Sequence, residues 1–291
     1  MNGLDDSPIG RRKRADVFFR VLAAASAAIV LLSLLLILGT ILWKSVPALS
    51  LSMLTETPKG GFYLGKEGGI LNAIVGSLDL ALGATALALL LSLPLALYLN
   101  VYKGRASKTA VWTRFFLDVL WGVPSIVYGA FGFVVMLALG LRASLLAGIL
   151  TVALFEFPIM SRAIDEVMRL VPRELKEASA SLGATRFETA LKVMVRQSAP
   201  GILTGVLLAF GRGIGDAASV LFTAGFTDRV PASLADPAAT LPLAIFFQLG
   251  TPFPEVQQRA YASAAVLTLI ILIISLAGRA MSRKVTRHVV K

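Results

Sequence analysis

Long runs of apolar residues alternate with shorter polar segments along the chain. A helix that spans a membrane needs about 20 apolar residues, because each residue advances about 1.5 Å through about 30 Å of hydrocarbon. The fourth such run contains Glu156, which we expect near its cytoplasmic end. The runs predict an all-α integral membrane protein with six transmembrane helices, at about 20–43, 74–99, 117–139, 143–160, 199–222 and 261–281.

The first apolar run has one feature of a secretory signal peptide, since RRKR at 11–14 supplies a basic segment before it. Its apolar core is longer than the roughly 7–15 residues of a signal peptide, and the VPALS that follows is a poor cleavage site. We therefore expect an uncleaved first helix. The chain then divides into a basic N-terminus (1–19), a six-helix domain (20–281) and a basic tail (282–291).

Lysine and arginine gather on one side of the predicted membrane domain. The loops 1–20, 102–116 and 161–198 and the tail from Arg279 hold most of them. Cytoplasmic loops of membrane proteins carry this excess, so both termini are expected in the cytoplasm. The net charge of +11 therefore follows from topology and argues against nucleic-acid binding. With 56% hydrophobic residues and no cysteine, the composition also excludes a disulfide framework and a thiolate metal site.

The cytoplasmic loop 161–198 has the pattern of a helical hairpin. Good helix formers follow Pro172, and Gly183 is able to end this helix because glycine adopts positive φ at little cost. Thr185 and Glu188 have the S/T-x-x-E spacing of a capping box. We therefore predict a helix, a tight turn and a second helix that begins directly after Thr185.

One face of the first hairpin helix suits contact with another protein. Leu175, Ser179 and Leu182 share this face, Ala178 lies beside them, and Glu177 points away. Small side chains allow a partner to approach the helix closely. The alternative is an ordinary hairpin that only closes the helix bundle.

The stretch EASASLG resembles the EAA motif of ABC-transporter permeases, written E-A-A, three residues, G, nine residues, I-x-L-P. Glu177, Ala178 and Gly183 match this motif, Ser179 is a conservative departure, and Arg196 stands where the family has proline. The resemblance implies the type I ABC importer permease fold, in which this hairpin is the coupling helix that enters a groove of the ATP-binding subunit. The chain has no G-x-x-x-x-G-K-[ST] run, so ATP and Mg²⁺ are expected on partner subunits and no cofactor on this chain.

Further stretches resemble the A-subunit type of phosphate permease. They are GGILNAIVGSL at 68–78, DVLWGVPSIVYGAF at 118–131, FGRGIGDAASVLFTAG at 210–225 and ATLPLAIFFQ at 239–248. The family pattern in the third stretch is close to R-x-x-G-E-T-A. Arg212 and Gly215 match it, and Asp216 stands in place of glutamate.

This second resemblance implies a permease subunit of an inorganic phosphate importer in a bacterial inner membrane. The implied partners are a homologous second permease in a heterodimer, two ATP-binding cassette subunits and an extracytoplasmic phosphate-binding protein. The loops 44–70 and 225–260 are long enough to receive that binding protein. Membrane lipid surrounds the complex, and the chain itself is expected to catalyse no reaction.

Arg212 and Asp216 lie in an otherwise uncharged segment from Pro200 to Gly225. We expect Arg212 near the membrane centre, where a charge is costly unless it faces the protein interior and is paired. As i,i+4 neighbours on one helix, the two residues could form an ion pair that only holds the bundle together. The functional alternative is that Arg212 contacts the substrate anion, Asp216 is its counter-charge, and Gly215 allows close backbone approach.

Other functions and residues stay open at this stage. A permease for sulfate or molybdate is the nearest alternative, although LFTAG and TLP favour phosphate. A secondary transporter or channel would need no ATPase and would leave EASASLG without a role, and a membrane scaffold would not need Arg212. Asp79, inside the second predicted span, either lines a vestibule or has no specific role.

Overall fold

The computed structural model describes residues 8–60, 67–103 and 107–286. Regular structure in these ranges is helical, apart from an isolated antiparallel bridge between Pro58 and Gly68. The elements are α1 (Pro8–Ser45), α2 (Leu51–Thr55), α3 (Leu71–Leu97), the π-helical η2 (Tyr98–Tyr102), α4 (Lys108–Trp121), α5 (Ser125–Ala138), α6 (Leu145–Arg169), α7 (Arg173–Ser181), α8 (Arg186–Glu188), the π-helical η3 (Thr189–Val195), α9 (Arg196–Ile214), α10 (Leu241–Leu249) and α11 (Pro254–Thr286).

The helices have the lengths and apolar stretches of a multi-pass membrane protein. Within the described residues, five are long and apolar enough to cross a membrane, and the bent pair α4–α5 passes the same test when its two helices are taken together as one span. α6 lies at the centre and buries most of its apolar stretch. It packs against α3 through small residues: Ala84 and Ala88 are fully buried, and Gly83 admits the side chain of Ile149. Such residues let membrane helices approach closely.

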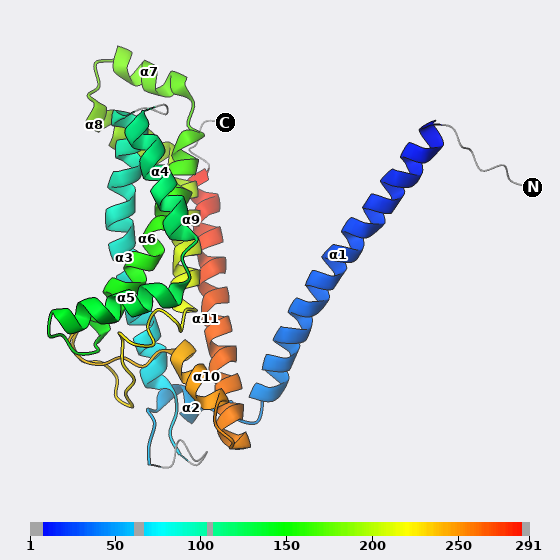
Figure 1. The fold of residues 1–291 in the computed structure, drawn as a ribbon, viewed down its shortest axis with the longest axis vertical. Coiled ribbons are helices and arrows are strands. Elements are labelled where there is room, and N and C mark those ends of the chain that lie inside the picture. The colour runs from blue at the N-terminus through cyan, green and yellow to red at the C-terminus, as the bar shows by residue number, and fades with distance from the viewer. Residues whose placement is uncertain (1–7, 61–66, 104–106, 287–291) are drawn as a thin grey trace, which may run out of the picture.

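α1 stands apart from this bundle. It leaves the other helices at the end where it meets α11 and leans away from them along its length (Figure 1). None of its apolar stretch is buried within the chain. Lys44, near its last turn, contacts Tyr261 of α11 through both the hydroxyl and the ring. In this single chain the apolar surface of α1 is therefore free to meet lipid or another subunit.

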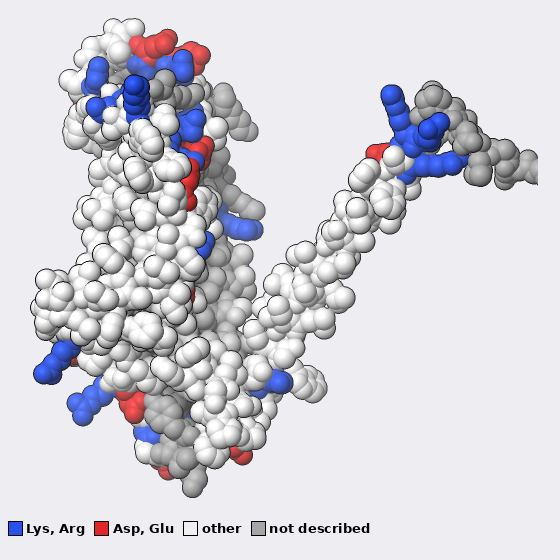
Figure 2. Space-filling view, viewed as in Figure 1, with Lys and Arg blue, Asp and Glu red and all other residues white. Residues whose placement is uncertain are grey.

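Charged side chains separate into two ends with an apolar belt between them (Figure 2). Lysine and arginine, together with some acidic side chains, gather around α7 and α8 and at the start of α1, and α11 ends on this same side of the molecule (Figures 1 and 2). The opposite end, around α2 and α10, carries charges of both signs. The belt is the part of the surface suited to hydrocarbon.

The third predicted span, 117–139, is not one straight helix. α4 and α5 meet at an angle of 97° across residues 122–124. The cause is local: Gly122 caps α4, and Pro124 has no N–H to continue a helix and restricts Val123 before it. α5 consequently runs across the bundle rather than along it (Figure 1).

Two further predicted spans have wrong ends. The fourth, 143–160, continues to Arg169, because charged residues in its last turns are satisfied by ion pairs inside the protein. Glu156 is therefore fully buried in mid-helix rather than near the cytoplasmic end. The fifth, 199–222, ends at Ile214 as helix α9, and a chain of turns follows.

The remaining predicted spans lie inside helices of the structure. The first, 20–43, is part of α1, which begins at Pro8, so the described part of the basic N-terminus continues that helix. The second corresponds to α3 and η2, and the sixth to α11. Residues 287–291 of the predicted tail lie outside the described residues.

Candidate functional site

Arg212 occupies the last turn of α9. Its side chain is exposed in the single chain, and its guanidinium lies over the ring of Phe155 from α6, 5.1 Å from the ring centroid. A cation over an aromatic face is attracted by the ring quadrupole. In the described part of the chain Arg212 forms no ion pair. Its charge thus remains available to an anion from outside the chain.

Asp216 does not pair with Arg212, so the i,i+4 ion pair that their spacing allowed is not formed in this structure. Helix α9 ends at Ile214, and Asp216 lies beyond it, where it no longer shares a helix face with Arg212. Ser125 Oγ donates to one carboxylate oxygen of Asp216 at 2.7 Å, and the Ser219 N–H donates to the other at 2.8 Å. Aspartate side chains form such local bonds to following N–H groups, which stabilises a turn in place of further helix.

Gly215 caps α9 and is exposed beside Asp216. Gly213 serves a different purpose, since a Cβ there would collide with the buried carboxylate of Glu156. Glu156 accepts a 3.3 Å hydrogen bond from Thr85 of α3. α3, α6 and α9 therefore come into close contact at Glu156, next to the turn of α9 that carries Arg212.

The turns after α9 pack tightly against α5. A Cβ on Gly129 would lie 2.7 Å from the carbonyl oxygen of Ala218 and 2.9 Å from that of Ser219. Gly129 thus lets the segment that carries Asp216 approach the α5 backbone.

Gly129→Ala is expected to destabilise the protein, because backbone atoms cannot move aside as a flexible side chain can. Overpacking of this kind costs about 1–3 kcal/mol. Gly211→Ala is the matched control, since a Cβ at that helical position meets nothing within 4 Å. Thermal unfolding in detergent should show a lower midpoint for Gly129→Ala alone. Equal midpoints for the two variants would contradict the close packing of this loop.

The predicted helical hairpin is present as α7, a tight turn and the continuous run α8, η3 and α9. Gly183 has a φ of +78°, and Thr185 and Glu188 form the complete capping box. Ser179 and Thr189 hydrogen-bond across the hairpin at 2.9 Å. Arg196 is an exposed residue at the start of α9, so the helix passes uninterrupted through the position where the family has proline.

The faces of α7 differ in part from the prediction. Leu175 packs against the body of the protein and Ser179 is half-buried, but Leu182 is 88% exposed. Leu182 caps the end of the helix, where the chain turns, and so leaves the face of Leu175. Glu177 and Ala178 are exposed. The hairpin consequently presents a free surface that includes Glu177, Ala178 and Leu182.

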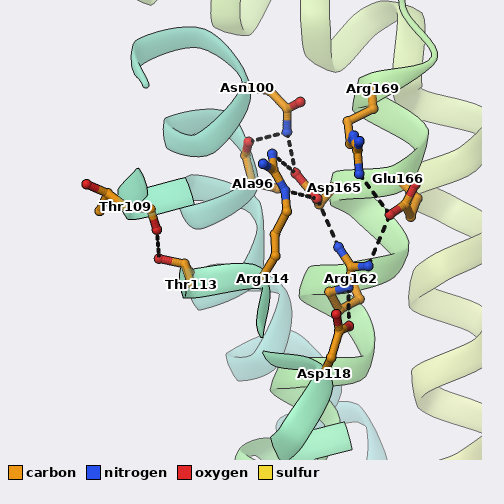
Figure 3. Close-up of polar contacts among 10 residues, drawn as sticks. All are labelled: Ala96, Asn100, Thr109, Thr113, Arg114, Asp118, Arg162, Asp165, Glu166 and Arg169. Carbon is orange, nitrogen blue, oxygen red and sulfur yellow. Dashed lines mark hydrogen bonds and ion pairs between the residues drawn. The ribbon is translucent and has the colours of Figure 1, made fainter. Parts of the chain in front are cut away.

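An ion-pair network near the hairpin was not indicated by the sequence motifs (Figure 3). Arg114 of α4 binds Asp165 of α6 through two hydrogen bonds, of 2.8 and 3.0 Å, and the Asp165 side chain is fully buried. Sequence reasoning placed both positions in cytoplasmic loops, where charges are ordinarily solvated. A helix continuing past residue 160 was the signal that could have placed Asp165 inside the protein.

A cavity of about 540 Å³ lies at the end of the molecule opposite the hairpin. Its lining includes Glu56, Lys59 and Arg259, and it does not include Arg212. Glu56 hydrogen-bonds Lys59 and thereby raises the pKa of that ammonium group. Asp79 lies in neither place, but on the exposed face of α3.

Comparison with known proteins identifies the family. The model for the binding-protein-dependent transport system inner membrane component matches residues 92–291. The chain belongs to this family of permeases. Several relatives of this permease are named phosphate transport system permease protein PstA. The one from Haemophilus influenzae is 35% identical over 92% of this chain and 94% of that protein. One from Yersinia pestis is 34% identical over 94% and 92%.

Solved structures show the same fold. The permease resembles an inward-facing structure of the MetNI methionine ABC transporter with a TM-score of 0.62 and 18% identity, over 79% of this chain and 99% of that one. A bacterial ABC transporter for the polysaccharide alginate gives a TM-score of 0.56 at 16% identity, over 94% and 99%. The type I importer permease fold expected from the EAA-like motif is therefore confirmed, and the relatives place the chain in the PstA branch.

Proposed function

We propose that this permease forms one half of the translocation pathway of an ATP-driven inorganic phosphate importer. The observation that carries the proposal is Arg212: an exposed arginine without an ion-pair partner in the described structure, in a stretch that resembles the R-x-x-G-E-T-A pattern of phosphate permeases. Arginine stays protonated at any physiological pH, and its planar guanidinium can bind two phosphate oxygens at once. Sulfate and molybdate are the competing anions that the test must exclude.

We propose Asp216 as the counter-charge of this site, although it forms no ion pair with Arg212 in this conformation. Its two bonds, from Ser125 and from the Ser219 N–H, keep its carboxylate away from the guanidinium in this conformation. A nearby fixed negative charge weakens the binding of an anion to Arg212, and a transported ion must leave its site as well as enter it. Gly215 has no side chain to obstruct the approach of the substrate.

The hairpin surface is proposed to contact the ATP-binding subunit. Glu177, Ala178 and Leu182 are exposed on it, whereas Ser179 and Gly183 preserve the shape of the hairpin. An exposed leucine at the tip of a charged helix suits insertion into a groove of a partner protein. Two such ATP-binding subunits would supply ATP and Mg²⁺, one for this permease and one for the homologous second permease.

The orientation follows from the charge distribution. The basic end, with α7, α8, the start of α1 and the end of α11, faces the cytoplasm of the bacterial inner membrane under the positive-inside rule. The opposite end, with segments 44–60 and 225–260, then faces outward, and an extracytoplasmic phosphate-binding protein would deliver its ligand there.

Reconstitution into proteoliposomes tests this function. The permease, its paired permease, the ATP-binding subunits and the binding protein should together take up phosphate only when ATP is present. We expect sulfate and molybdate at equal concentration to be excluded. Uptake that continues without the ATP-binding subunits would indicate a secondary transporter or channel, and preferential sulfate uptake would reassign the substrate.

A further inference from the structure

The bent pair α4–α5, residues 108–138, links the two sites described above. We refer to this segment as the elbow. Its first half is tied to the helices that carry the hairpin. Just after its bend it hydrogen-bonds Asp216 and packs against Phe155, the ring beneath Arg212. Most of these contacts are hydrogen bonds or ion pairs, and a hydrogen bond from Tyr128 to the Leu120 carbonyl oxygen spans the bend.

The cytoplasmic end of the elbow is anchored by the ion-pair network of Figure 3. Arg114 and Asp165 form the bidentate pair, and Arg162 of α6 lies 2.6 Å from Asp118 and 3.2 Å from Asp165. Besides Arg114, only Ala110 and Leu117 of α4 are buried. Because α4 buries only these three residues, its position depends strongly on the ion pair of Arg114.

The same network reaches the hairpin. The side-chain amide of Asn100, in η2, donates a 2.7 Å hydrogen bond to Asp165. The backbone carbonyl oxygen of Asn100 accepts a hydrogen bond from Lys176 of α7. Leu175 of α7 packs into the cluster that contains Met168 of α6. α7 is therefore in direct contact with the helix that holds Asp165 and with Asn100, which binds Asp165.

Next to its bend, the elbow reaches the substrate site in two ways. Ser125, the first residue of α5, donates to Asp216. Tyr128 donates to the Leu120 carbonyl oxygen at 2.8 Å, which ties α5 to α4 across the bend. The Tyr128 ring also meets Phe155 edge-on at 5.7 Å, and Phe155 is the ring beneath Arg212.

Structural cohesion alone is a weak explanation for this network. A buried ion pair contributes little net stability compared with apolar side chains of similar size, because removing both charges from water is costly. Ionisable groups within membrane helices are rare and are associated with function. Discrete packed and hydrogen-bonded elements are also the means by which distant sites become coupled.

We propose that the elbow transmits the movement of the coupling hairpin to the substrate site, and that Arg114 is the positioning residue that engages it. When α7 moves with the ATP-binding subunit, Asp165 and Arg114 move α4. The fixed bend carries this movement to Ser125 and Tyr128, which shift Asp216 and the Phe155 ring relative to Arg212. The proposal rests on the transport function proposed above, and concerns how that function is driven.

The first test uses the complete reconstituted transporter and two readouts, phosphate uptake and ATP hydrolysis. Arg114→Gln is expected to lower the phosphate moved per ATP roughly three- to thirtyfold, while hydrolysis continues. Arg114→Lys keeps the charge but only one of the two bonds, so an intermediate ratio is expected. Asp16→Asn is the matched control, because it removes the exposed Asp16–Arg20 pair on α1, and its ratio should be unchanged. An unchanged ratio for Arg114→Gln would overturn the proposal.

The second test measures movement without phosphate. The chain has no cysteine, so spin labels can be placed at the exposed positions Val119 and Leu272 alone. The distance between them should differ between nucleotide-free and ATP-vanadate-trapped complexes, and Arg114→Gln should abolish the difference. A difference that persists in Arg114→Gln would refute the role of Arg114. If instead the distances respond as expected but phosphate is not taken up by the unmodified complex, the substrate assignment fails and the elbow proposal stands.

Ser125→Ala tests the contact with Asp216 independently of the ion-pair network. It also provides a test of the proposal if the Arg114→Gln complex does not assemble. It removes the bond to Asp216 without disturbing the ion-pair network. The distance change between labels should then persist, whereas the phosphate moved per ATP should fall. Normal phosphate movement per ATP in Ser125→Ala would contradict the proposed link to Asp216.

Discussion

Arg212→Ala is expected to abolish ATP-driven phosphate uptake while the transporter still assembles. Each hydrogen bond to a charged group contributes about 1.5–3 kcal/mol, so the loss of two of them lowers uptake by about 100-fold or more. Assembly should be spared, because Arg212 is exposed in the chain and its removal leaves no buried ion-pair partner behind. Uptake of radiolabelled phosphate into proteoliposomes measures the effect.

Two companion variants make this result specific. Arg212→Lys retains the charge without the planar fork, and we expect uptake between that of Arg212→Ala and the unmodified permease. Arg279→Ala removes an exposed arginine near the end of α11 and should leave uptake normal. Normal uptake in Arg212→Ala would remove this residue from the pathway.

Gly183→Val is expected to disconnect transport from ATP hydrolysis. Gly183 has a φ of +78°, and a β-branched residue forced into that region costs about 1–3 kcal/mol, so the turn between α7 and α8 must change shape. The exposed surface around Glu177 and Leu182 would then no longer fit its partner. We expect phosphate-stimulated ATP hydrolysis to fall about tenfold, with less ATP-binding subunit retained on purification.

The control for this variant has nearly the same backbone conformation. Gly140 has a φ of +68°, and neither Gly140 nor Gly183 has any atom within 4 Å of an added Cβ. Gly140→Val should therefore cause similar local strain outside the hairpin and leave the stimulation of ATP hydrolysis intact. If both valine variants lose stimulation equally, general destabilisation rather than coupling would explain the result. Glu177→Ala, which introduces no strain, should weaken stimulation by a smaller factor.

Local sequence signals were accurate where the physics is local. Pro172, Gly183 and the pair Thr185 and Glu188 predicted the hairpin, because caps and positive φ depend on residues close together in the chain. The EAA-like spacing, which lies within one loop, was sufficient to indicate the permease fold. Arg212 was found because a charge in a long apolar run is conspicuous.

The predictions failed where a helix end depended on packing between distant segments. Apolar length suggested that the fifth span reached residue 222, but α9 ends at Ile214. Asp216 bonds to Ser125 and Ser219 and does not form the ion pair that its spacing from Arg212 allowed. Ser125 is 91 residues away in the chain, so no local pattern could have indicated this contact.

The sequence by itself determined the membrane class, the helical hairpin and the candidate substrate arginine. Hydrocarbon thickness, capping and the cost of a charge in lipid act on each segment separately, and each leaves a local pattern. Only the tertiary structure decided that Arg114 and Asp165 are buried partners, that the third span bends by 97°, and that the resulting elbow reaches Asp216. These features arise from contacts between residues far apart in the chain, which the order of residues along one helix does not reveal.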